Sequence, residues 1–130
     1  MKAKSSTILR QAQDQTARKN NVSKAVFCQI WLTVGSKDEA DKIANTLLVK
    51  HLIACARQIP VESYFWWKGR KEHSKEVLLQ MESRNDLFNQ IEKEVTKLHS
   101  YDTFVLESTT VDKISKSASD WLLKELADEA

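Results

Sequence analysis

The sequence predicts one α+β domain preceded by a polar tail. Segments with alternating apolar residues follow one another along the chain with segments of helical apolar periodicity, and 130 residues suffice for one core of ordinary size. Apolar residues make up 42% of the chain and charged residues 29%, a balance typical of a globular protein. We therefore divide the chain into a flexible tail, 1–24, and one domain, 25–130.

Hydrophobic periodicity places the elements of the domain in the order βαββαβ, followed by a last helix. Ser36 and Glu39 form a Ser-x-x-Glu capping box, which marks the start of the first helix. Lys68-Gly69-Arg70 supplies the turn of a long β-hairpin, whose first arm is interrupted by Pro60. The predicted elements are a strand at 26–34, a helix at about 37–51, a hairpin of 53–67 and 74–82, a helix at about 86–98, a strand at about 103–111 and a helix at about 114–127.

This order is that of the ferredoxin-like sandwich, in which one antiparallel sheet carries its two crossover helices on one face. The other face then needs a cover. Trp31 and Phe27 lie on the opposite side of the first strand from Ile30 and Leu32. Assembly with other copies of the chain would cover this second face. The alternative is that the C-terminal helix folds over it.

The hairpin tip favours assembly. Four consecutive aromatic residues, Tyr64–Trp67, stand near the predicted turn. Left solvated, they would form an unusually large exposed apolar patch for a monomer. We therefore expect an interface between subunits that contains Trp31, Phe65, Trp66 and Trp67.

Charge separates the tail from the domain. Residues 1–25 hold six basic residues and one acidic residue, whereas residues 26–130 hold 14 basic and 17 acidic residues. A basic, polar tail without apolar periodicity cannot bury enough surface to fold, so we expect it to be flexible. A transit peptide or a nucleic-acid-binding arm is the alternative. The mildly acidic domain argues against nucleic acid as a partner.

Several classes of protein are disfavoured by what the sequence lacks. No segment approaches the roughly 18 consecutive apolar residues that a membrane span needs, so we expect no membrane partner. Cys28 and Cys55 form no Cys-x-x-Cys pair, which favours reduced thiols and a cytoplasmic location. With only Gly35 and Gly69, the chain cannot form a glycine-rich phosphate loop. We expect no enzymatic activity, and an active site formed between subunits is the alternative.

Short motifs occur in a fixed order between residues 26 and 126. They are Asp38-Glu39-Ala40, Leu52 through Ala56 followed by Ile59-Pro60, Ser63 through Gly69, Glu76-Val77, His99-x-Tyr101-x-Thr103 and Asp120-Trp121-Leu122. With these motifs the chain resembles the CutA family, which are trimeric ferredoxin-like proteins associated with divalent-cation tolerance and akin to the PII signalling proteins. The resemblance implies a homotrimer in which the hairpin of each subunit reaches a neighbour.

The chain departs from the family pattern near the fourth strand. Family members usually read His-Pro-Tyr-x-x-Pro-Glu where this chain has His99 through Val105, and Glu82 stands where a lysine normally ends the third strand. The positions to which copper is assigned in some members fall on Val34, Leu98 and His99. The resemblance therefore implies that the ligands for copper or another divalent cation are only partly retained. The candidates are His99, Cys55, Tyr101 and Asp102.

Each candidate also has a simpler role. A free cysteine at an apolar strand start, such as Cys55, usually packs as a small hydrophobe, and His99 would close its helix. Two functions therefore stay open. One is divalent metal homeostasis, and the other is a PII-like trimeric scaffold that binds a small ligand or a protein without a metal function.

Overall fold

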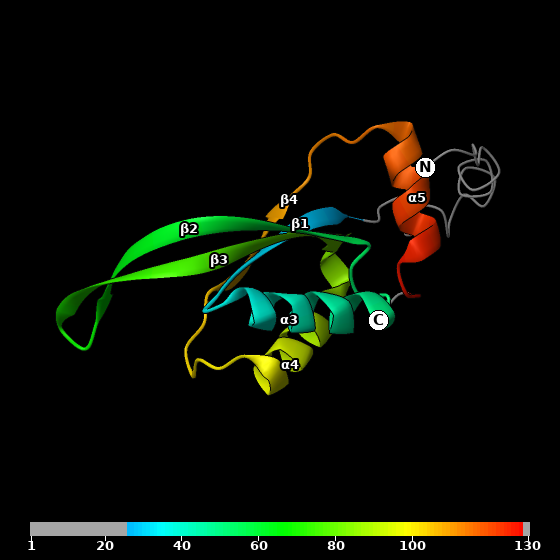
Figure 1. Cartoon of the computed structure of the whole chain (residues 1–130). Helices are drawn as coiled ribbons and strands as arrows, with labels where there is room; N and C mark the ends of the chain where they lie inside the picture. Colours follow the sequence, from blue (N-terminus) through cyan, green and yellow to red (C-terminus); the bar gives the residue numbers. More distant parts are fainter. Residues whose placement is uncertain (1–25, 129–130) are drawn as a thin grey trace.

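The computed structural model describes residues 26–128, which form a four-stranded antiparallel sheet with strand order β2-β3-β1-β4 and three α-helices (Figure 1). The predicted tail, 1–24, lies outside the described residues. The order of elements confirms the predicted α+β, ferredoxin-like plan with a last helix. The elements are β1 Phe27–Val34, α3 Lys37–Val49, β2 Cys55–Trp67, β3 Arg70–Arg84, the 3₁₀ turn η1 Asn85–Leu87, α4 Phe88–Leu98, β4 Leu106–Thr110 and α5 Lys116–Glu125.

The first helix begins at the predicted cap. The hydroxyl of Ser36 accepts a hydrogen bond from the Glu39 N–H at 3.2 Å, which satisfies one of the donors that a helix N-terminus leaves free. Apolar residues then recur with the helical period, so one stripe of α3 is buried. The helix ends at Val49, and His51 adopts a φ of 58° just after it.

The core lies between one face of the sheet and the two crossover helices. Figure 1 shows α3 and α4 together on that face. Alternate residues of β1 and β3 point into this layer, because successive side chains of a strand face opposite sides. The fully buried side chains from the sheet include Ile30, Leu32, Leu79 and Met81, and those from the helices include Ile43, Leu47, Ile91 and Val95.

The hairpin is one continuous ladder. Its register runs without a break from Cys55 opposite Glu82 to Trp67 opposite Arg70. Lys68 and Gly69 form the turn with φ values of 52° and 77°, the conformation of a two-residue type I′ turn. The outer part of the hairpin extends well past α3 and α4 (Figure 1).

The structure corrects several predicted features of the elements, and the second arm of the hairpin, predicted at 74–82, extends over Arg70–Arg84. Pro60 does not interrupt β2, because β2 is an edge strand and can lack an N–H on its unpaired side. The strand predicted at 103–111 is shorter, Leu106–Thr110, since the residues before it form a loop. The helix predicted at 114–127 spans only Lys116–Glu125.

The last helix lies at the end of the sheet opposite to the hairpin tip (Figure 1). His51 Nδ1 lies 2.8 Å from the Glu125 carbonyl, and Arg84 donates to the Ala127 carbonyl at 2.8 Å. These bonds fix α5 at that end of the sheet, and Trp31, further along β1, is only half-buried. The alternative in which α5 covers the whole second face is therefore wrong.

The second face is more polar than its aromatic residues suggest. Arg57 donates to Gln80 at 2.7 Å and to Glu82 at 2.9 Å, so an ionic network crosses β2 and β3. Beside it, the indole N–H of Trp31 donates to the hydroxyl of Thr109 at 3.0 Å. None of the helices among residues 26–128 has both the length and the apolar character to cross a membrane.

Candidate functional site

His99 closes α4 and anchors the loop that leads to β4. Its side chain is fully buried and stacks on Phe104 with ring centroids 4.9 Å apart. The Nε2 atom lies 2.8 Å from the Thr33 carbonyl, which can only accept, so Nε2 carries the proton. The Nδ1 atom accepts the Tyr101 N–H at 3.1 Å. Binding a metal ion would require His99 to give up one of these two bonds.

Glu39 reaches the same loop from α3. Its carboxylate accepts the Ser100 N–H at 2.6 Å, the Ser100 hydroxyl at 3.0 Å and the Gly35 N–H at 3.3 Å. Partial burial alone would raise the pKa of Glu39, but the two bonds from Ser100, the nearby His99 ring and the Gly35 N–H outweigh it, so this pKa lies below its ordinary value. Glu39 therefore holds the loop as a carboxylate at neutral pH.

Tyr101 ties the loop to the hairpin. Its hydroxyl donates to a carboxylate oxygen of Glu76 in β3 at 2.7 Å. Burial and this bond, with the charges of Glu76 and Glu39, raise the pKa of Tyr101 to about 12. The start of the loop is thus fixed at two adjacent residues, Ser100 to α3 and Tyr101 to β3.

A cavity of about 750 Å³ lies between the outer part of the hairpin and this loop. Its described lining includes five aromatic side chains and three carboxylates. The lining residues are Thr33, Ser63, Phe65, Trp66, Trp67, Glu72, Glu76, Tyr101, Asp102, Thr103, Phe104 and Val105. The cavity is therefore formed by the loop and the hairpin together.

The predicted metal residues fall into two separate places. Tyr101 and Asp102 line the cavity, with His99 buried just behind them. In the sheet, Cys55 lies opposite Glu82, and Glu82 lies opposite Gln29 of β1. His99 instead bonds to Thr33, which is four residues, or about 13 Å, further along β1 than Gln29. In one chain the structure therefore groups three of the four residues and separates Cys55 from them.

The predicted interface residues are mostly exposed in the single chain. The exposed fractions are 40% for Phe65, 71% for Trp66 and 45% for Trp67. Trp31 is half-buried and lies on the second face of the sheet, far from the hairpin turn. The exposure of these residues is consistent with an interface between subunits. The interface itself stays a prediction.

Sequence reasoning missed the acidic residues of this site. Glu39 was assigned only to the helix cap, and Glu76 and Glu72 were given no role. Glu39 bonds to Ser100, 61 positions away, and Glu76 bonds to Tyr101, 25 positions away, so no local spacing reveals either pair. Two signals were available: the alternation of Glu72, Ser74 and Glu76 on one side of β3, and the presence of Glu39 and Glu76 in the short motifs.

Comparison with known proteins identifies the family. A family model described as CutA1 divalent ion tolerance protein matches residues 28–125. The divalent-cation tolerance protein CutA of Archaeoglobus fulgidus is 34% identical over 93 residues, which cover 72% of this chain and 91% of that protein. The protein of the same name from Pyrococcus horikoshii is 31% identical over 96 residues, 74% of this chain and 94% of that protein.

Solved structures agree with this assignment. The periplasmic divalent cation tolerance protein CutA from Archaeoglobus fulgidus has a TM-score of 0.75 at 32% identity and covers 76% of this chain and 97% of its own. CutA1 from Pyrococcus horikoshii has a TM-score of 0.74 at 29% identity, covering 78% of this chain and 99% of its own. From the family model and these relatives, the chain belongs to the CutA1 divalent ion tolerance protein family.

Proposed function

We propose that this protein contributes to tolerance of divalent cations, copper among them, and that it acts as a homotrimer. The observation that carries the proposal is the match of residues 28–125 to the family described by that role. The relatives from Archaeoglobus fulgidus and Pyrococcus horikoshii are named for divalent-cation tolerance as well. These names describe no catalysed reaction, and we propose a non-enzymatic role.

The exposed hairpin supports the proposed homotrimer. Trp66 and Trp67 lie beyond the helix-covered part of the sheet and are 71% and 45% exposed. Large aromatic side chains gain free energy when a neighbouring subunit removes them from water, at roughly 25 cal/mol per Å² of apolar surface. Sedimentation of the purified chain at micromolar concentration tests this part of the proposal, which predicts a species of three chains.

One chain alone does not present a prepared metal site. Within residues 26–128 no three His, Cys, Asp or Glu side chains are grouped so that they could hold a metal ion. Both ring nitrogens of His99 already have partners, and Cys55 lies elsewhere on the sheet. These residues therefore do not fit a tight copper site in one chain. Metal binding by His99, Cys55, Tyr101 and Asp102 stays a prediction, and such a site would need further ligands from a second subunit.

We also propose a cytoplasmic location, on the basis of the cysteines. Cys28 and Cys55 are both free thiols, and burial raises the pKa of Cys28 to about 11, so this thiol stays protonated. Free thiols are typical of a reducing compartment. Imaging of the full chain fused to a fluorescent protein tests this proposal, and a signal confined to an organelle or to the cell envelope would contradict it.

A growth assay tests the proposed role in cation tolerance. Cells that lack their own CutA would be grown across a range of copper and zinc concentrations, with and without this chain. We expect the chain to raise the concentration that halves growth. Titration calorimetry with copper and zinc, on the wild type and on His99→Ala and Cys55→Ala, then asks whether the effect comes from direct binding. Unchanged growth together with no heat of binding would favour the scaffold alternative.

A further inference from the structure

We propose that His73, in the outer part of the hairpin, makes the contact between subunits depend on pH, so that a proton on its ring weakens the assembly. This regulation rests on the proposed homotrimer, in which a neighbouring subunit covers the outer hairpin. His73 lies in β3 and is not among the candidate metal residues. Its place beside a predicted interface residue, its two partners on β2 and the charges around it all favour this role.

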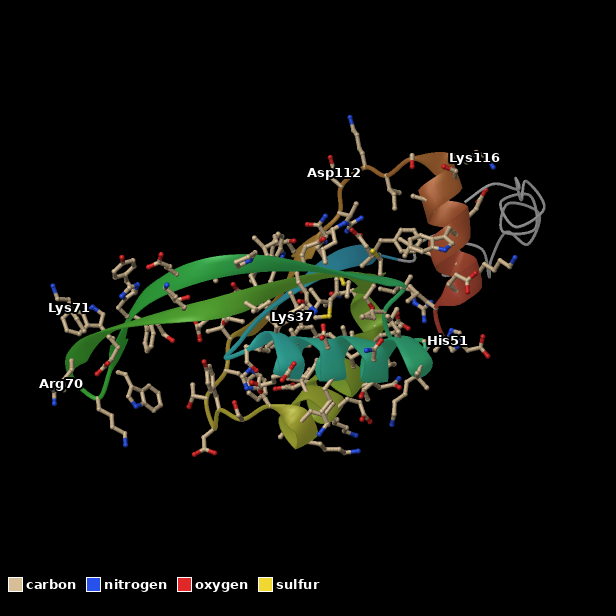
Figure 2. The ribbon with its side chains drawn as sticks, in the orientation of Figure 1. Lys37, His51, Arg70, Lys71, Asp112 and Lys116 are labelled. Carbon is tan, nitrogen blue, oxygen red and sulfur yellow. The ribbon has the colours of Figure 1, made fainter. Side chains whose placement is uncertain are left out.

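His73 shares one face of the hairpin with Trp66, a predicted interface residue that is 71% exposed in the single chain. Residues two apart on a strand point to the same side, and so do residues directly opposite each other on neighbouring strands. Figure 2 shows Lys71, which also belongs to this face, at the outer end of the hairpin. We call this surface the His73 face, and its residues are Glu62, Tyr64, Trp66, Lys71, His73 and Lys75. A subunit that covers Trp66 therefore lies close to His73.

The ring of His73 has two partners on β2. It stacks on Tyr64, directly opposite, with ring centroids 4.3 Å apart and an angle of 8° between the planes. Its Nε2 atom lies 2.7 Å from the Oε1 atom of Glu62. An ionised carboxylate only accepts, so Nε2 carries a proton and Nδ1 is the atom that gains one in acid. Within residues 26–128, Nδ1 has no hydrogen-bond partner, so the single chain offers no acceptor for this second proton.

The His73 face is already positively charged when His73 is neutral. Glu62 is its one carboxylate, whereas Lys71 and Lys75 carry ammonium groups, which gives one excess positive charge. Lys75 lies directly opposite Glu62 and competes with His73 for that carboxylate. The carboxylates of β3 that line the cavity alternate with these residues and point to the other side. A proton on His73 therefore raises the excess from one positive charge to two.

Assembly makes this extra charge costly. Histidine side chains ordinarily change their charge between about pH 5 and pH 8, and a charge that loses contact with water costs free energy unless a partner neutralises it. Assembly therefore favours neutral His73 and releases protons from it, so a fall in pH weakens the contact. A weakening of about threefold at each contact, within the range for partly solvated charges, would weaken a ring of three contacts by about 30-fold.

Exchange of subunits between assemblies measures the effect on the full chain. Unlabelled and ¹⁵N-labelled protein would be mixed at pH 7.5 and at pH 5.5, and native mass spectrometry would follow the mixed particles. A chelator would be present, so that metal ions play no part. His73→Gln keeps an N–H donor for Glu62 but cannot gain a charge, whereas His73→Lys carries a charge at both pH values. His51→Gln is the matched control, because it removes another exposed histidine, which lies after α3 and away from the hairpin tip (Figure 2).

We expect the wild type to exchange at least about tenfold faster at pH 5.5 than at pH 7.5, because protonation weakens all three contacts. His73→Gln should exchange slowly at both pH values and His73→Lys rapidly at both. His51→Gln should behave like the wild type. Sedimentation of the wild type at both pH values gives the number of chains per particle.

Three results would overturn the proposal while leaving the homotrimer in place. Wild-type exchange that does not change with pH would show that assembly is not linked to a proton. A pH effect that His73→Gln retains would assign the link to other groups. A His73→Lys protein that exchanges as slowly as the wild type at pH 7.5 would show that the His73 face tolerates the charge. A species of one chain at pH 7.5 would instead contradict the homotrimer itself, and the proposal with it.

Discussion

The two halves of the β2–β3 hairpin share one ladder, but their surroundings differ. In the inner half, Leu79 and Met81 are fully buried under the crossover helices. In the outer half, Tyr64 and Trp66 project from the strand at 76% and 71% exposure. Backbone hydrogen bonds between the two strands can continue along the whole hairpin. The stability of each half, however, depends on the side chains that cover its faces. The inner half is covered within one chain, whereas the outer half is left exposed in the single chain.

The replacement Trp67→Ala tests the outer half and has the largest expected effect. If Trp67 packs into a neighbouring subunit, truncation removes a large aromatic surface and costs about 3–5 kcal/mol per site. A homotrimer incurs this loss three times, so the variant should dissociate, and its melting temperature should depend on protein concentration. Sedimentation and thermal unfolding at two concentrations measure both effects.

An exposed apolar residue provides the reference for this test. Val49 is 78% exposed at the end of α3, and Val49→Ala should change the free energy of unfolding by less than about 0.5 kcal/mol. A Trp67→Ala protein that assembles and melts like Val49→Ala would show that Trp67 is not an interface residue. The aromatic tip would then be a docking surface for another protein.

The replacement Leu79→Ala tests the inner half. Leu79 is fully buried, so its truncation should lower the free energy of unfolding by about 3 kcal/mol through lost burial and the cavity left behind. Leu48 in α3 is 36% exposed, and Leu48→Ala, which is the same chemical change, should cost clearly less. Denaturant unfolding measures both. If the two variants lost equal stability, the assignment of the core to the helix-covered half would be contradicted.

The replacement Glu39→Gln tests the loop between α4 and β4, which bonds to the hairpin through Tyr101. Because the folded-state pKa of Glu39 lies below the unfolded value of about 4.3, its contribution is present above that pH and is lost as pH falls through the folded pKa. At pH 7 we expect the variant to lose about 1–2 kcal/mol, since a charged acceptor for Ser100 is replaced by a neutral one.

Stability curves between pH 7 and pH 3 provide the measurement. The wild type should lose its advantage over Glu39→Gln as the pH falls below about 4, so that the curves converge. Parallel curves over this range would mean that the Glu39 carboxylate does not hold the loop. Glu92→Gln is the control, because Glu92 is exposed on α4.

Local patterns in the sequence predicted the order of elements well. The Ser36 cap and the turn at Lys68 and Gly69 depend on residues a few positions apart, and both are present in the structure. The ladder through Pro60 was missed, because its tolerance depends on β2 being at the sheet edge. The position of a strand at the sheet edge depends on the order of all the strands, so the local sequence around Pro60 does not reveal it.

The candidate site was predicted less completely than the fold. The importance of residues 99–102 was evident from the motif there, but their partners were not. Thr33, Glu39 and Glu76 each approach the loop from a different element, and only the packed fold brings them together. The cavity has the same origin, since its walls come from the hairpin tip and from a loop after α4. Sequence spacing therefore indicated where the site begins without showing what faces it.

The replacement Tyr101→Phe has the smallest expected effect and tests the bond between the loop and the outer half. Losing the hydroxyl that donates to Glu76 should cost about 1 kcal/mol at neutral pH. The pKa of Tyr101 is about 12 in the folded state and about 10 in an unfolded chain. Its contribution is thus fully present below pH 10 and is lost as pH rises toward 12, because the unfolded chain releases the proton first.

The alkaline limb of the stability curve distinguishes this bond from general alkaline unfolding. Other groups that titrate there affect the wild type and Tyr101→Phe alike, so the difference between the two curves isolates the Tyr101 hydroxyl. We expect the wild type to lose more stability than the variant between pH 10 and pH 12, while Tyr64→Phe, at a tyrosine that is 76% exposed, follows the wild type. If the wild-type and Tyr101→Phe curves stayed parallel, the loop would not be tied to β3 through Glu76. The outer half of the hairpin would then lack this bond to the loop that follows α4.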